Sequence, residues 1–129
     1  MPQRGWTDED VYLVADRAHS LYLQGCCREA AVLLEGLTVV DPKNSYCHDA
    51  LAAAYLALGQ PQQAVLAASV ALRLQPNHAD ARARRCEAYV QLRKFDEARQ
   101  DLDALRQVRA TAHIRRLQLR LRIASSARG

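Results

Sequence analysis

The sequence predicts an all-α fold, in which three helical hairpins stack into a superhelix and a terminal helix covers its end. The first reason is composition: Ala, Leu, Arg and Gln dominate the 129 residues, whereas there are only five Gly and four Pro. These straight-chain and small residues lose the least entropy in a helix. The second reason is an internal period of 34 residues, which is the mark of stacked helical hairpins.

The period is visible in several independent columns. Pro42 and Pro76 are 34 residues apart, and so are Gly25 and Gly59. The same step relates three alanines and two tyrosines: Ala30, Ala64, Ala98, Tyr55 and Tyr89. Because the columns agree without an insertion, they predict one domain over 1–129 with repeats at 11–44, 45–78 and 79–112.

The first helix is expected to begin near Asp8. Thr7 and Asp10 have the spacing of a capping box, with Asp in place of Glu or Gln, and Trp6 and Val11 flank the box as a hydrophobic staple. In the first two repeats a glycine ends the first helix and a proline stops the second. These signals predict helices over 8–24, 28–40, 45–58, 62–75, 79–92 and 96–109.

A seventh helix is expected over 112–124, because Ile114, Leu117 and Leu121 form one apolar stripe at helical spacing. A solenoid requires such a helix to cover its last exposed seam. This end of the chain is also basic. From Leu105 onward there are seven arginines and no acidic residue, while the preceding residues carry 11 basic and 14 acidic side chains.

From Val11 to about Ala112, the columns resemble the tetratricopeptide repeat. The second row matches best, through Ala52, Tyr55, Gly59, Ala64 and Pro76. The resemblance implies a right-handed α-α superhelix of three hairpins. It also implies that the first helix of each hairpin lines a concave groove that holds a polypeptide.

The chain departs from this pattern at six positions. Arg93 stands in place of the turn glycine and Ala110 in place of the closing proline. Four polar residues occupy early-helix columns where the family places apolar side chains: Arg17, His48, Arg82 and Arg85. These four predict thinner packing between the first helices.

The small and aromatic columns fix which side of each first helix faces its neighbour, so the groove side follows from helical spacing. The predicted groove residues are Tyr12, His19, Tyr22, Leu23, Tyr46, Asp49, Ala53, Leu56, Ala83, Glu87 and Val90. Three of them are tyrosines, which offer a large contact area at modest entropy cost. Asp49, Asp80 and Glu87 are expected to make one flank acidic.

Some tetratricopeptide domains grip the C-terminal carboxylate of heat-shock chaperones with a clamp of Lys, Asn and Arg side chains. The matching positions in this sequence are Ala15, His19, Ala50, Asp80 and Arg84. Only Arg84 has the required chemistry, and Asp80 would repel a carboxylate. The sequence therefore argues against a carboxylate clamp.

A closer resemblance is to the class II chaperones of bacterial type III secretion systems, through the segments 21–25, 37–41, 57–60 and 86–88. It implies a small cytoplasmic protein that holds an extended segment of a secreted translocator before export. These chaperones usually carry a longer helical arm before the first repeat, which this sequence lacks. Whether the chain forms a homodimer as they do therefore stays open. The use of 16 Arg against 2 Lys agrees with a GC-rich bacterial source.

No pattern in the sequence points to catalysis, a metal or a cofactor. His19, His48, His78 and His113 are too far apart for metal-ligand spacing, and no Gly-rich phosphate loop is present. Cys47, His48 and Asp49 are consecutive, so on a helix their side chains diverge. We therefore expect no enzyme.

The expected location is the cytoplasm. No segment approaches the run of roughly 18 apolar residues that a membrane span needs. The N-terminus turns acidic where a signal peptide would be apolar, and the four cysteines show no disulfide or CxxC pattern.

One alternative function remains: a generic scaffold or oligomerisation module whose basic C-terminal helix contacts an acidic partner, nucleic acid or an anionic surface. Arg115, Arg116, Arg120 and Arg122 would supply the charge. No aromatic residue interleaves with them for base stacking, which disfavours nucleic acid.

Overall fold

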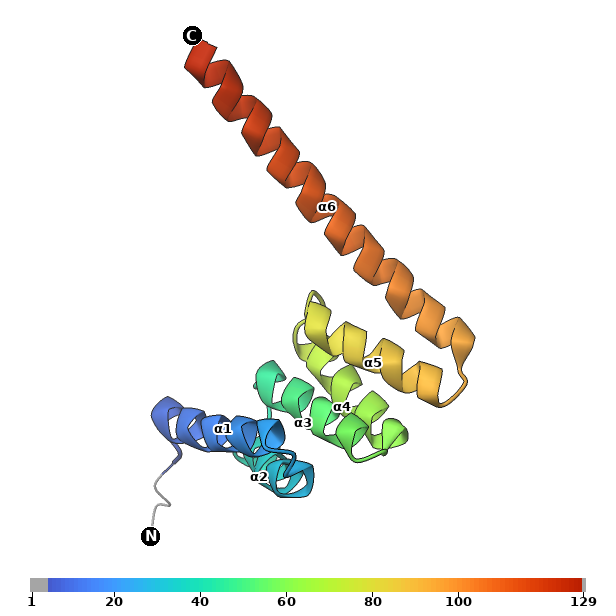
Figure 1. Cartoon of the computed structure of the whole chain (residues 1–129). Helices are drawn as coiled ribbons and strands as arrows, with labels where there is room; N and C mark the ends of the chain where they lie inside the picture. Colours follow the sequence, from blue (N-terminus) through green and yellow to red (C-terminus); the bar gives the residue numbers. More distant parts are fainter. Residues whose placement is uncertain (1–4, 129) are drawn as a thin grey trace.

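The computed structural model describes residues 5–128, with side chains through Ser126, and this part of the chain contains six helices and no strand. The predicted domain range of 1–129 thus includes five residues outside the described part. The helices form three successive hairpins (Figure 1): α1 (Asp8–Leu23), α2 (Cys27–Val40), α3 (Ser45–Ala57), α4 (Pro61–Leu74), α5 (Ala79–Gln91) and α6 (Phe95–Arg128). No helix among the described residues is long and apolar enough to cross a membrane.

The capping box that the sequence predicts at the start of α1 is present. The Asp10 backbone N–H donates to Thr7 Oγ1 at 3.1 Å, and the Thr7 N–H donates to Asp10 Oδ2 at 2.9 Å. Two further first helices begin with a side-chain cap: Asn44 accepts from the backbone of Tyr46 at the start of α3, and His78 accepts from Ala81 at the start of α5. These caps satisfy backbone donors that a helix start leaves without partners.

The turn within each hairpin uses one left-handed residue. Gly25 and Gly59 have φ of 85° and 72°, as their positions predict. Arg93 adopts the same conformation, with φ of 60°, although its Cβ disfavours it. The third hairpin therefore keeps the geometry of the other two without their glycine.

Small residues form most of the core. Ala18, Ala52 and Ala64 are almost completely buried where paired helices cross, and Leu34 and Leu37 fill the seam toward the second hairpin. The largest cluster of buried side chains joins α1, α2, α3 and α4. A separate and smaller cluster, Ala71, Leu72 and Ala81, joins α4 to α5.

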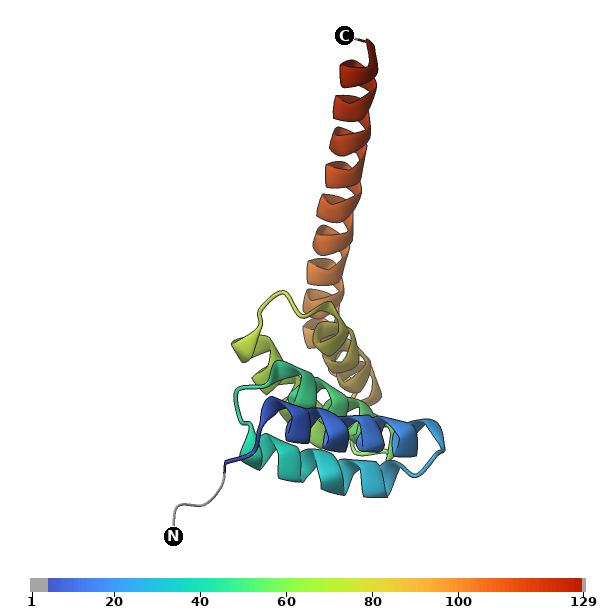
Figure 2. The ribbon, with the colours of Figure 1, turned by 90° about the vertical axis from the view of Figure 1, so that its left-hand side faces the viewer.

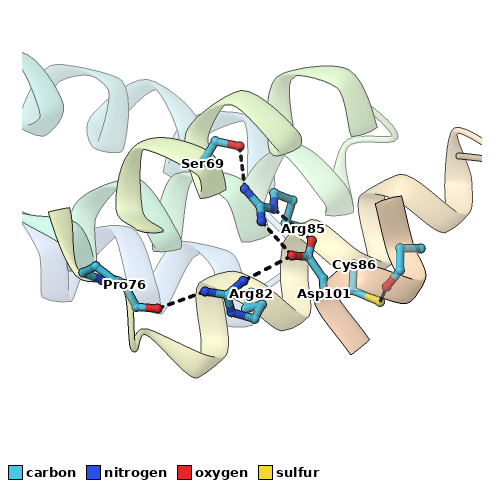
Figure 3. A network of polar contacts seen from close by, with 7 residues as sticks. Ser69, Pro76, Arg82, Arg85, Cys86 and Asp101 are labelled. Carbon is cyan, nitrogen blue, oxygen red and sulfur yellow. Dashed lines mark hydrogen bonds and ion pairs between the residues drawn. The ribbon is translucent and has the colours of Figure 1, made fainter. Parts of the chain in front are cut away.

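An ion-pair network helps to hold the third hairpin, where the arginines at apolar columns predict thinner packing (Figure 3). Arg85 donates to both carboxylate oxygens of Asp101, at 2.8 and 2.6 Å, and Arg82 donates to the same carboxylate at 3.4 Å. The two arginines also donate to the Ser69 hydroxyl and the Pro76 carbonyl. The network therefore joins α4, α5 and α6 where the family places apolar side chains.

The other two polar departures also leave the core intact. His48 donates from Nε2 to the Pro42 carbonyl at 2.9 Å, and Arg17 is exposed. At the third hairpin, by contrast, the buried apolar cluster consists only of Ala71, Leu72 and Ala81, which agrees with the thinner packing that Arg82 and Arg85 predict.

The prediction of a separate capping helix over 112–124 was also wrong. These residues are helical, but they continue α6, which runs unbroken for 34 residues and projects away from the rest of the molecule (Figures 1 and 2). Ala110 stands where a proline would stop the helix, and alanine is the strongest helix former. As a result, Ile114, Leu117 and Leu121 are 52%, 43% and 69% exposed and cover no seam.

Candidate functional site

A cavity of about 240 Å³ opens between α1, α3 and α5, the first helices of the three hairpins, which lie next to one another (Figure 1). Its apolar lining consists of four alanines and one leucine: Ala15, Ala18, Ala50, Ala53 and Leu34. Its aromatic and polar lining consists of His19, Tyr22, Tyr46, Asp49, His78, Asp80 and Arg84. The cavity thus combines an apolar surface with a small number of polar groups, as ligand sites commonly do.

Five of the eleven predicted groove residues line this cavity: His19, Tyr22, Tyr46, Asp49 and Ala53. Tyr22 is partly buried, whereas half of the surface of Tyr46 is exposed. Both tyrosines therefore combine contact with the cavity and access to solvent.

The other six predicted residues lie outside the cavity. Tyr12 and Leu23, toward opposite ends of α1, are exposed by 68% and 70%. Leu56 on α3 is partly buried, while Ala83, Glu87 and Val90 on α5 are exposed. The structure therefore gathers one half of the predicted groove into a defined hollow and leaves the other half as open surface.

Asp49 and Arg84 form an ion pair across this site. The Arg84 guanidinium donates from Nε to Asp49 Oδ1 at 2.7 Å, and the Asp49 side chain is only 6% exposed. Removing one partner from such a buried pair leaves an uncompensated charge. The pair joins α3 to α5 and neutralises a carboxylate that the sequence assigns to an acidic flank.

Asp80 keeps that flank partly acidic. It lines the cavity, is exposed, and forms no ion pair among the described residues. Glu87, the third acidic residue predicted here, does not line the cavity. The acidic character is therefore confined to one carboxylate beside the paired Arg84.

Two histidines complete the polar lining. The Nδ1 atom of His78 accepts from the Ala81 backbone N–H at 3.2 Å, so the proton of the neutral ring lies on Nε2. His19 is exposed on α1. Both rings therefore provide hydrogen-bonding groups beside the apolar surface.

The sequence-based prediction of the groove omitted several lining residues, including Ala50, His78 and Arg84. A signal for most of them was present, because all five positions that match the carboxylate clamp line the cavity: Ala15, His19, Ala50, Asp80 and Arg84. His78 had no such signal, since it enters the site as the cap of α5.

Two of the remaining tyrosines belong to helix packing. The Tyr55 hydroxyl donates to Glu35 Oε1 at 2.7 Å, and burial together with this carboxylate raises the pKa of Tyr55 to about 12. The Tyr89 ring lies 5.9 Å from the Arg85 guanidinium, a cation–π distance.

Two of the four cysteines, Cys47 and Cys86, are disfavoured as nucleophiles. All four are free thiols, and burial raises the pKa of Cys47 to about 11 and the pKa of Cys86 above its ordinary value. A raised pKa disfavours the nucleophilic thiolate. Within residues 5–126, no group of three or more His, Cys, Asp or Glu side chains could hold a metal ion.

Comparison with known proteins gives a family match. The model described as "Tetratricopeptide repeat" matches residues 55–121, which are 67 of the 129 residues. None of the curated proteins matches this chain.

Solved structures show the same fold. The second tetratricopeptide domain of Spaghetti (RPAP3), bound to the HSP90 peptide SRMEEVD, is 25% identical with a TM-score of 0.72 over 74% of this chain and 88% of that one. The second domain of human RPAP3, in complex with an HSP70 peptide, is 25% identical with a TM-score of 0.69 over 74% and 82%. PcrH in complex with the chaperone binding region of PopB is 20% identical with a TM-score of 0.80 over 84% and 87%.

Proposed function

Because this chain belongs to the tetratricopeptide-repeat family, we propose that it is a non-catalytic module that binds an extended segment of a client protein in its cavity. The observation that carries the proposal is the hollow between α1, α3 and α5, with alanines on its surface and two tyrosines beside them. Small residues leave room for side chains of a client, while tyrosines are enriched where binding energy concentrates.

The charges of the cavity favour an apolar or internal segment of the client over a free C-terminal carboxylate. Arg84, the one cation at a clamp position, already pairs with Asp49 at 2.7 Å. Asp80 adds a negative charge beside it. A client carboxylate would therefore meet an arginine whose charge Asp49 already balances, and it would lie close to Asp80, so the local charge disfavours it.

We further propose that the client is a secreted protein of the translocator type, and that binding takes place in the cytoplasm of a bacterium. The fold shared with PcrH supports this proposal at the level of architecture. So does the tyrosine-bearing apolar cavity, because a chaperone for a hydrophobic subunit needs apolar contact surface.

The experiment measures the binding of overlapping synthetic peptides from secreted proteins of the translocator type. Tyr22→Ala and Tyr46→Ala should each weaken the binding of an active peptide by ~1–3 kcal/mol, because both rings line the cavity. Tyr12→Ala is the matched control, since Tyr12 shares α1 with Tyr22 but lies outside the cavity. Equal affinities for all three variants would refute the cavity as the binding site.

A second candidate function rests on the projecting part of α6. It carries four arginines on a helix that leaves the body of the molecule, Arg115, Arg116, Arg120 and Arg122 (Figure 2). Such a helix could contact an acidic partner, a nucleic acid or an anionic surface. This function would be favoured over the cavity if partner binding weakened steeply with added salt. Arg116→Gln should then weaken binding as well, whereas Tyr22→Ala should leave it unchanged.

A further inference from the structure

The second half of α6 has an apolar face that begins inside the body of the molecule. Five apolar residues recur at intervals of three, four or seven positions, so they lie along one side of the helix. Val108, Leu119 and Ile123 among them are 44%, 57% and 62% exposed. We name these five residues the cavity-side face of α6: Leu105, Val108, Ala112, Leu119 and Ile123.

This face starts in a second cavity, which we name the α6 cavity. The α6 cavity has a volume of about 540 Å³ and lies between α6 and the start of α5. Leu105, Val108 and Ala112 line it on one side, and Arg82 lines it on the other. Beyond it α6 leaves the body of the molecule (Figure 1), and all residues over 113–126 are exposed. The apolar face is therefore recessed at one end and fully open at the other.

Arginines border the cavity-side face on both edges. At 100° per residue, Arg115 and Arg122 lie along one edge, whereas Arg109, Arg116 and Arg120 lie along the other. All five are exposed, and none forms an ion pair among the residues whose side chains the structure describes. Arg116 and Arg120 are also four residues apart, a spacing at which like charges destabilise a helix. Both edges therefore carry positive charge that this part of the chain does not compensate.

This pattern favours an acidic helix over three other partners. A second copy of the face would bring the arginine edges of the two chains together, at a cost in free energy. A membrane surface suits a helix that is apolar on one face only, but Ile114, Leu117 and Leu121 make the opposite face of α6 apolar as well. A nucleic acid would contact the arginines and leave the apolar face uncovered, without an aromatic residue for base stacking. Only a helix with apolar and acidic side chains matches both the face and its edges.

We propose that the cavity-side face of α6 binds an acidic amphipathic helix of a partner protein. The apolar side chains of the partner pack on the face and into the α6 cavity, and its carboxylates pair with the arginines of both edges. This inference rests on the second candidate function and narrows its three kinds of partner to one. The α6 cavity shares no lining residue with the candidate client cavity between α1, α3 and α5. The two sites can therefore be tested separately.

The test is a titration of the full chain into a labelled synthetic peptide, followed by fluorescence anisotropy. The peptide is a helix of about four heptads with Leu at the two core positions and Glu at the two flanking positions. A peptide of the same composition in scrambled order is the control. The face is small, so we expect a Kd of roughly micromolar order for the helical peptide, and binding at least about tenfold weaker for the scrambled one. Added salt should weaken the binding of the helical peptide.

Variants locate the contact on one face of α6. Leu119→Ser should weaken binding about tenfold, because it removes an apolar side chain from the exposed half of the face. Leu117→Ser is the matched control on the opposite face and should keep the affinity within about twofold. Arg115→Glu combined with Arg122→Glu should weaken binding about tenfold or more, because it places like charges at one edge. The same double variant should bind a peptide with Lys along one flank more tightly than the wild type does.

Three results would overturn the proposal. Equal affinities for the helical and the scrambled peptide would show that charge alone drives the binding. Equal weakening by Leu117→Ser and Leu119→Ser would exclude the cavity-side face as the specific contact. Finally, the helical peptide could fail to bind while phosphatidylserine vesicles or duplex RNA bind the wild type and not the double arginine variant. That result would keep the second candidate function and refute the acidic helix as its partner.

Discussion

At the scale of single residues, the sequence signals that the structure confirms are those that act locally. The capping box of Thr7 and Asp10 spans three residues, and the glycine turns at Gly25 and Gly59 depend on one φ angle each. Such signals do not depend on which helices later pack together. Arg93 shows their limit, because the packing of α5 against α6 imposes the left-handed turn without the residue that favours it.

Arg93→Gly should stabilise the protein. An L-residue in the left-handed region costs about 1–2 kcal/mol, and glycine removes this cost. Glycine also gives the unfolded chain more conformational entropy, which offsets part of the gain in stability. We expect the free energy of unfolding to rise by about 0.5–1 kcal/mol in urea titrations followed by circular dichroism. Arg93→Ala is the control, since it removes the same side chain but keeps the strained Cβ. An equal gain from both variants would show that the side chain, and not the backbone, was responsible.

The hydrogen bond from Tyr55 to Glu35 should make stability depend on alkaline pH. The pKa of the Tyr55 hydroxyl is raised from 10.0 to about 12 in the folded protein, so the folded state holds this proton more tightly than the unfolded state does. The stability from this group is therefore complete below about pH 10 and is lost as the pH rises toward 12. Urea unfolding between pH 9 and about 12 should show a steeper loss for the wild type than for Tyr55→Phe. Parallel pH profiles for the two proteins would contradict the assignment.

At the scale of elements, five of the six helices could be predicted to within a residue or two. Turn signals bound four of them, and the 34-residue period sets the end of α5, where Arg93 replaces the glycine. The sixth could not. Its apolar stripe of Ile114, Leu117 and Leu121 predicts a helix correctly. However, there is no Gly or Pro between Leu105 and Ile114 to end the preceding helix. Whether such a stretch folds back depends on its packing against the other helices, which the local apolar pattern does not reveal, although Ala110 in place of a proline favours a continuous helix. Here α6 continues straight and leaves the stripe exposed.

The contact between α5 and α6 should depend on Asp101. The carboxylate is 2% exposed and receives both Arg82 and Arg85, and it also raises the pKa of the Arg85 guanidinium above its ordinary value. Asp101→Ala leaves two partly buried arginines without their partner, so it should destabilise the third hairpin by about 3–5 kcal/mol in urea.

The matched control for this variant is Asp103→Ala, two residues along the same helix. Asp103 is 58% exposed on its side chain and pairs with Arg106 only at 3.8 Å. An exposed pair of this kind contributes about 0.2–1 kcal/mol. If both alanine variants cost the same, the buried network does not hold the hairpin.

At the scale of the whole molecule, the site could be predicted helix by helix but not as one cavity. The faces of α1 and α3 follow from spacing, which is why His19, Tyr22 and Tyr46 were placed correctly on the hollow. The ion pair of Asp49 with Arg84 links residues 35 apart in sequence, and no local pattern announces it. The cavity therefore holds less unpaired acidic charge than the spacing suggests, and the predicted groove residues Ala83, Glu87 and Val90 on α5 lie outside it.

The division of the core predicts how the molecule opens. Cys47 is completely buried in the cluster that joins the first two hairpins. The third hairpin is attached through the smaller cluster, the Asp101 network and the ion pair of Asp49 with Arg84. Because a solenoid is stabilised by interfaces between neighbouring repeats, the third hairpin should be able to open while the first two stay folded. Asp101→Ala should therefore leave the rate at which iodoacetamide modifies Cys47 unchanged within about twofold at pH 8 without denaturant. Because Cys47 is completely buried, the reagent reaches it only when the first two hairpins open, in both proteins. Burial also raises the pKa of this thiol to about 11, which slows the modification of both proteins alike. A rate that rises in proportion to the loss of stability would instead show that all three hairpins unfold as one unit.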